Sequence, residues 1–129
     1  MFSGLRWVFL WLWQLPQNVV GLVYCFVVRA KYVSRMGEVR FYRHGSAYGS
    51  VSLGNFIFLS RHASRRTMLH EYGHHRQSEW LGPLYLILVG LPSLLWASLR
   101  SVGFFRRKPY SWFCIERWAD VLGGADRLD

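Results

Sequence analysis

Two histidines four residues apart, His70 and His74, are separated by a segment that begins with a glutamate, Glu71. Residues with this spacing project from the same face of an α-helix, so both imidazoles can bind one zinc ion. Zinc lowers the pKa of a bound water towards neutrality, and a carboxylate beside the first ligand can take that proton. The segment therefore predicts a Zn²⁺ site in which Glu71 is the general base.

A zinc site of this kind needs a third protein ligand, which a second acidic motif near the C-terminus can supply. Glu116 and Asp120 are four residues apart and share a helix face. Glu116 is predicted to bind the metal, and Asp120 to accept a hydrogen bond from a ligand histidine. Gly73 lies inside the first motif, although glycine disfavours a helix by about 1 kcal/mol relative to alanine. Its presence indicates that another backbone or the metal approaches closely.

The paired motifs, His70-Glu71-x-x-His74 and Glu116-x-x-x-Asp120, resemble the gluzincin clan of zinc metallopeptidases, the thermolysin-like group. The resemblance implies peptide-bond hydrolysis, with Glu116 as the third zinc ligand and Asp120 orienting a histidine. It also implies an edge strand before the active-site helix, here about residues 55–59, along which an extended substrate binds.

Two features depart from the gluzincin pattern. The motifs are about 40 residues apart, which is longer than the thermolysin-like spacing, and no histidine or tyrosine follows Asp120 to stabilise an oxyanion. Tyr110, His75 or an arginine could take that role. If Glu116 is not the third ligand, His75 and His62 are the next candidates.

The elements that must position these residues indicate a single α+β domain over residues 1–129. An active-site helix is expected over residues 63–79, capped by Ser64 or Thr67, and a ligand helix over 111–124. Alternating and β-branched residues predict a β-hairpin over 37–60, with Gly54 as a bulge.

The first apolar block, about residues 5–28, would be roughly 36 Å long as a helix, enough to cross a bilayer core of about 30 Å. We therefore expect a transmembrane helix over residues 1–30, kinked by Pro16. A cleaved signal peptide is the alternative, but polar residues interrupt the block. They share one helix face that must pack on protein or water: Gln14, Gln17 and Asn18.

The second apolar block, residues 80–100, would place Glu116 across the membrane from the histidines if it spanned the bilayer. Gly90 and Pro92 interrupt it, so a re-entrant hairpin of two half-helices is expected. Basic residues are concentrated after the first block, which predicts an external N-terminus and a cytoplasmic remainder. They are Arg29, Lys31, Arg35, Arg40 and Arg43.

The net charge of +9 fits an anionic membrane surface or a nucleic acid, and the long apolar runs favour the membrane. The two cysteines, Cys25 and Cys114, are expected to be free thiols. The sequence thus predicts an integral membrane zinc metallopeptidase, in a bacterial inner membrane with its site facing the cytoplasm, acting on peptides or proteins. A catalytically silent zinc-stabilised module that binds a partner protein is the alternative. The arginines are scattered and form no reader motif, which argues against a nucleic-acid partner.

Overall fold

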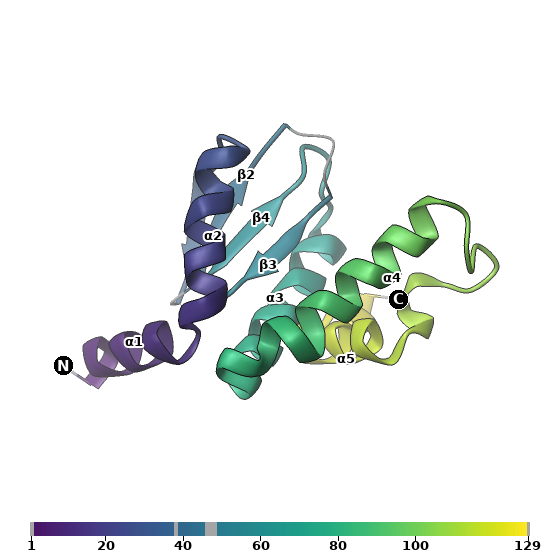
Figure 1. Cartoon of the computed structure of the whole chain (residues 1–129). Coiled ribbons are helices and arrows are strands. Elements are labelled where there is room, and N and C mark those ends of the chain that lie inside the picture. Colours follow the sequence, from purple (N-terminus) through teal and green to yellow (C-terminus); the bar gives the residue numbers. More distant parts are fainter. Residues whose placement is uncertain (1, 38, 46–48, 129) are drawn as a thin grey trace.

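The structure is a computed structural model that describes residues 2–37, 39–45 and 49–128. This part of the chain has an α+β fold, as predicted (Figure 1). Its α-helices are α1 (Phe2–Trp13), α2 (Leu15–Val27), α3 (Arg65–Leu81), α4 (Leu91–Ser101) and α5 (Cys114–Gly123). Its strands are β1 (Lys31–Met36), β2 (Val39–Arg43), β3 (Val51–Leu53) and β4 (Phe56–Leu59).

The strands form one mixed sheet in the order β1-β2-β4-β3. β1 is antiparallel to β2, β2 is parallel to β4, and β3 is antiparallel to β4. The single hairpin predicted over residues 37–60 is therefore wrong. Gly54 has φ +66°, which turns the chain between β3 and β4, so it is not a bulge within one strand. The expected edge strand at residues 55–59 is also wrong, because β4 is central and the sheet's edges are β1 and β3.

The sheet lies between α2 and α3, and β4 is buried on both faces. On one face, the rings of Phe58 and Tyr24 of α2 are 4.9 Å apart. On the other, the core consists of Val39, Phe41, Ile57 and Leu59, with Met68 and Tyr72 of α3 packed against it. This packing places α3 directly against the sheet.

The first apolar block consists of two helices, α1 and α2, bent by 86° at Gln14. Pro16 lies in the first turn of α2, where its missing N–H leaves no helical hydrogen bond unmade. The kink is confirmed, but it is a near right angle, so the single kinked helix predicted over residues 1–30 is in fact two separate helices. In the described part of the chain, no single helix is long and apolar enough to cross a membrane. The bent pair passes that test by length and composition alone.

The polar face predicted on α2 is confirmed, and it packs on protein. Gln14, Gln17 and Asn18 are each 0% exposed. The Gln17 amide donates to Ser78 Oγ and to the Gly82 carbonyl, both at 2.8 Å. These hydrogen bonds attach α2 to the end of α3.

The second apolar block does not reverse at Gly90 and Pro92, so the predicted re-entrant hairpin is wrong. The chain turns at Gly82–Leu84 and then runs as one helix over Leu86–Ser101. Its first part, Leu86–Gly90, is π-helical, and a wider turn of this kind accommodates the N–H that Pro92 lacks. The reversal comes after Ser101, in the loop that leads back to α5. Glu116 is thereby returned to α3, as the metal site requires.

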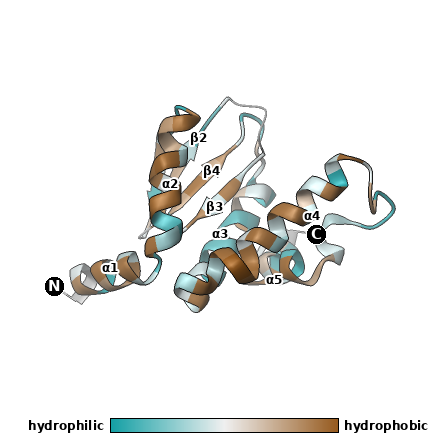
Figure 2. Cartoon of the chain, in the orientation of Figure 1, coloured by the Kyte–Doolittle hydropathy of each residue, from teal (hydrophilic) through white to brown (hydrophobic). Residues whose placement is uncertain are grey.

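Both cysteines are free, as expected. Figure 2 shows that α1, α2 and the Leu86–Ser101 helix are largely hydrophobic, whereas α3 is largely hydrophilic.

Candidate metal centre

α3 carries the His70-Glu71-x-x-His74 motif and begins where the sequence predicted. The Ser64 hydroxyl caps the helix by accepting a hydrogen bond from the Thr67 N–H at 3.2 Å. The helix spans Arg65–Leu81, so it ends two residues later than the predicted 63–79.

α3 and α5 cross with their backbones in direct contact. A Cβ on Gly73 would lie 1.7 Å from the Ala119 carbonyl oxygen, and one on Gly123 would lie 1.8 Å from the Leu69 carbonyl oxygen. Only glycine fits at these two positions. The close approach predicted from Gly73 is therefore confirmed, and its partner is the backbone of α5.

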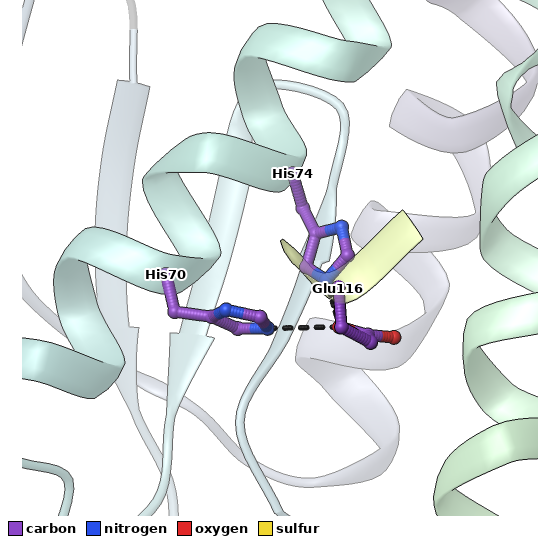
Figure 3. A group of neighbouring side chains, drawn as sticks. All are labelled: His70, His74 and Glu116. Carbon is purple, nitrogen blue, oxygen red and sulfur yellow. Dashed lines mark hydrogen bonds and ion pairs between the residues drawn. The ribbon is translucent and has the colours of Figure 1, made fainter. Parts of the chain in front are cut away.

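This crossing brings the three predicted ligands together (Figure 3). Glu116 Oε2 lies 2.9 Å from His70 Nε2 and 2.9 Å from His74 Nε2. One ligand atom from each residue lies within 4.8 Å of the others, so the cluster could hold a metal ion. His70 is partly buried, whereas His74 and Glu116 are buried.

Hydrogen bonds fix the orientation of both imidazoles. Asp120 Oδ1 lies 2.6 Å from His70 Nδ1, and Gln77 Oε1 lies 2.7 Å from His74 Nδ1. An Nδ1–H donor on each ring leaves the Nε2 lone pair for a metal. The hydrogen bond of Asp120 was predicted. That of Gln77 was missed, although Gln77 is one turn after His74 on the same helix.

Glu116 is fully buried and ionised. Burial raises its pKa, but hydrogen bonds from His70 and His74 outweigh burial and hold the pKa at about 2. The Ser93 hydroxyl donates to its second oxygen, Oε1. Ser93 comes from the apolar block, and nothing in its local sequence marks it as part of a polar site.

Without a bound metal, His70 and His74 hold a proton more strongly than ordinary histidines, because they lie beside the Glu116 carboxylate. Burial lowers the pKa of His70, but the hydrogen bond to Glu116, the charge of Glu71 and the hydrogen bond to Asp120 raise it to about 9. The pKa of His74 is raised by its hydrogen bond to Glu116 and by Glu71, against the effect of burial. A metal ion at this centre therefore competes with protons.

Glu71 points into a cavity of about 590 Å³ rather than joining the three ligands. Its side chain is buried, and burial raises its pKa above the ordinary value, against the charges of His74 and His70. A carboxylate with a raised pKa is a stronger proton acceptor than an ordinary one. The cavity lies between α2, β3, α3 and the Leu86–Ser101 helix.

Of the three candidates for the oxyanion role, Tyr110 lies at the centre. Its ring is 5.9 Å from that of His70, and it lines the same cavity as Glu71. Burial, with the charges of Glu116 and Glu71, raises its pKa, so the phenol keeps its proton.

His75 and Arg66 have other partners. His75 is fully buried, with Nδ1 at 2.8 Å from the Gly54 carbonyl and Nε2 at 2.9 Å from Glu79. Arg66 pairs with Asp120 at 3.6 Å. His75 therefore joins α3 to the sheet and does not reach the centre.

Comparisons of the chain with protein-family models, with curated proteins and with solved structures find no match.

Proposed function

We propose that the protein is a zinc metallopeptidase of the gluzincin type. One observation carries the proposal: two histidines of α3 and a buried glutamate of α5 converge beside a second buried glutamate, Glu71, at the wall of a cavity. A purely structural ion-pair cluster needs neither the free carboxyl group nor the cavity.

The donor set suits zinc better than the harder divalent cations. Calcium and magnesium prefer six or more oxygen ligands, whereas two imidazoles and one carboxylate are a set found in catalytic zinc sites with an open fourth position. His70, His74 and Glu116 would hold the ion. A bound zinc ion would polarise the substrate carbonyl and make a water molecule acidic.

The protein's own groups would carry the proton and the developing charge. Glu71 would take a proton from the attacking water and deliver it to the leaving amine, as its raised pKa favours. Tyr110, protonated at neutral pH, would donate a hydrogen bond to the oxyanion. Asp120 and Gln77 would hold the two imidazoles in place.

The edge strand β3 supports an extended peptide as the substrate. Its residues Val51–Leu53 line the cavity that contains Glu71. The outer edge of β3 is not paired with another strand of this sheet, and such an edge can hydrogen-bond to an added strand. Peptide main chain bound there would run past the metal centre.

An integral membrane location, with the site on the cytoplasmic side of a bacterial inner membrane, remains part of the proposal. The exposed apolar helices support a membrane location, and the basic residues that follow α2 suit the anionic headgroups of the cytoplasmic leaflet. Membrane-associated peptides or proteins are then the accessible substrates.

The rival is a silent zinc-stabilised module that binds a partner protein. It is favoured by the absence of a histidine or tyrosine after Asp120, although Tyr110 offers a replacement from another element. The two functions differ in whether Glu71 matters for more than metal binding.

The deciding experiment compares Glu71→Gln with the wild type after purification in detergent. Zinc content is measured by mass spectrometry, and hydrolysis with a library of unstructured peptides. We expect full zinc content and a loss of hydrolysis of about 10²–10⁴-fold, because proton transfer is lost and coordination is spared. Glu79→Gln is the matched control, since Glu79 is on the same helix but pairs with His75 outside the cavity.

Two results would contradict these assignments. Zinc loss in Glu71→Gln would make Glu71 a ligand. A zinc-loaded wild type that hydrolyses no peptide but unfolds at a lower temperature after zinc removal would favour the silent module.

A further inference from the structure

Three helical segments expose apolar side chains that no other part of the described chain covers. They are α1, the outer side of α2 and the outer side of the Leu86–Ser101 helix. Phe26 is 83% exposed, Ile87 66% and Phe9 62%. Monomeric soluble proteins rarely expose contiguous apolar surface of this extent. In Figure 1, α2 and α4 both lie on the near side of the molecule, in front of the sheet and α3, and in Figure 2 both are largely hydrophobic.

The bend between α1 and α2 limits how deeply this surface can enter a bilayer. The two helices have 12 and 13 residues, about 18 and 20 Å at 1.5 Å per residue. At 86° the pair spans about 27 Å end to end, compared with a hydrocarbon core of about 30 Å. Although the pair passes a test of length and composition, it would cross only if the line between its ends stood along the bilayer normal and the bilayer thinned around it.

α1 is also attached to the end of α3. The indole N–H of Trp13 donates to the Glu79 carbonyl at 2.9 Å, and Arg6 pairs with the Glu79 carboxylate at 3.6 Å. These contacts hold α1 beside the body of the protein and at an angle to α2.

Exposed basic residues follow both apolar segments. Arg29 and Lys31 come directly after α2, and Arg106, Arg107 and Lys108 follow the Leu86–Ser101 helix. Positive side chains at the border of an apolar surface lie where anionic lipid headgroups would be, and each contributes about 1 kcal/mol of attraction. The net charge of +9 acts in the same direction.

The cavity beside the metal centre opens onto this same surface. Val20 of α2 and Leu91 and Leu94 of α4 line the cavity, yet they are 43%, 62% and 64% exposed. They therefore form its rim. Glu71 and His74 line the cavity from the buried side.

We infer that α1, α2 and the Leu86–Ser101 helix form one lipid-binding face that is seated in a single leaflet of an anionic bilayer. The N-terminus then lies on the same side as Lys108, in contrast to the external N-terminus expected from charge. The substrate enters between α2 and α4 from that leaflet, as an apolar peptide segment. The substrate route rests on the proposed peptidase function, whereas the seating does not.

Sidedness is tested by single-cysteine labelling in right-side-out and inside-out membrane vesicles. Gly4→Cys and Lys108→Cys are made separately after Cys25→Ser and Cys114→Ser, and a membrane-impermeant maleimide is added. Nothing lies within 4 Å of a Cβ at Gly4, so cysteine fits there. Labelling of both positions from the same vesicle type is expected. Labelling from opposite vesicle types would mean that α1 and α2 cross the membrane and would overturn the seating.

Lipid contact is tested by flotation of the purified protein with phosphatidylglycerol vesicles. Ile87→Glu is expected to lower the bound fraction about tenfold or more. The control is Val121→Glu, since Val121 is 56% exposed but on α5, behind α4 in Figure 1. Equal binding of the two variants would show that Ile87 does not contact lipid.

The substrate route is tested with two peptides that share one cleavable sequence, only one of which carries an apolar segment that inserts into vesicles. The wild type in vesicles should cleave the inserted peptide about tenfold faster or more, and Leu94→Glu should lose this preference while keeping its zinc. Equal rates for both peptides with the wild type would overturn entry from the leaflet. Cleavage of neither peptide by the zinc-loaded wild type would instead overturn the peptidase proposal, and the labelling result would still decide the seating.

Discussion

The α3–α5 pair and the three apolar segments distribute polarity in opposite ways. The buried residues of α3 include Glu71, His74, Gln77 and Ser78, whereas the exposed residues of α2 include Val23 and Phe26. Polar groups are expensive to bury, so each must find a partner inside. Exposing so many apolar side chains has a low free-energy cost only if the medium around these segments is also apolar. The proposed membrane seating would supply such a medium on the side of the molecule away from the α3–α5 pair.

The two regions are also held together differently. α3 and α5 meet backbone to backbone through Gly73 and Gly123, with no room for a methyl group. α2 is attached through side-chain amides, such as Gln17 to Ser78. Backbone contacts tolerate almost no displacement, while amide contacts can be lost one at a time. Perturbations of the first region should accordingly have the larger effects.

The largest effect is expected from Gly73→Ala. The new methyl group would meet the Ala119 carbonyl at 1.7 Å, so α5 must move and carry Glu116 away from the histidines. Overpacking of this kind costs about 1–3 kcal/mol or more, and we expect stoichiometric zinc binding to be lost. Zinc content by mass spectrometry and the free energy of unfolding in denaturant measure the two effects.

Gly4→Ala is the control for this substitution, because a methyl group at Gly4 meets nothing within 4 Å. Normal zinc content in Gly73→Ala would mean that the helix crossing does not determine the position of Glu116.

Next in size is the removal of single ligands and their supports. Glu116→Ala leaves two protein ligands, so zinc affinity should fall by more than about 100-fold. Asp120→Ala and Gln77→Ala act through an imidazole N–H and should each lower affinity about 10–100-fold. Competition titration with a zinc chelator measures the zinc affinity of each variant and so ranks the three. If Glu116→Ala binds zinc as tightly as the wild type, the third ligand lies elsewhere and the gluzincin assignment fails.

Because zinc and protons compete for the histidines, zinc affinity should depend on pH. His70 has a pKa of about 9 without metal, so at neutral pH zinc must displace its proton. Affinity should rise with pH by about tenfold per unit for each displaced proton and stop rising on this account above pH about 9. Calorimetric titration in buffers of different ionisation enthalpy counts the released protons.

Asp120→Asn should move the upper limit of this rise to lower pH, because the Asp120 hydrogen bond helps to raise the pKa of His70. Zinc affinity that is flat between pH 7 and 8.5 in the wild type would contradict the proton competition.

The smallest effects distinguish the two faces of α2. Gln17→Leu leaves Ser78 and the Gly82 carbonyl without their amide partner inside the protein, which costs about 1–3 kcal/mol of unfolding free energy. Phe26→Ala, at a side chain 83% exposed, should change the unfolding free energy in detergent by less than about 0.5 kcal/mol. Denaturation in the same detergent compares them. A large loss in Phe26→Ala would mean that protein, and not lipid, covers this face.

What the sequence determined by itself is the part of the molecule governed by helical spacing. His70 and His74 share a face because they are four residues apart, and the same rule applies to Glu116 with Asp120 and to Gln14 with Gln17 and Asn18. Gly73 predicted a close backbone contact, because glycine disfavours the helical conformation and must have another reason to be inside a helix. These inferences need only local geometry, and the structure bears them out.

The tertiary structure alone decided the features that depend on which segments of the chain meet. Ser93 joins the metal centre from outside both motifs, and no local feature predicts it. Tyr110 was one of several candidates from the sequence, and only its position beside His70 distinguishes it from the others. The order of the strands could not be predicted, because alternating residues indicate a strand but do not show which strand pairs with it. The turn at Gly82 and the near right angle at Gln14 were missed for a related reason. An apolar block indicates how much surface avoids water. The direction of each helix is decided by tertiary contacts, such as that of Trp13 with Gly82.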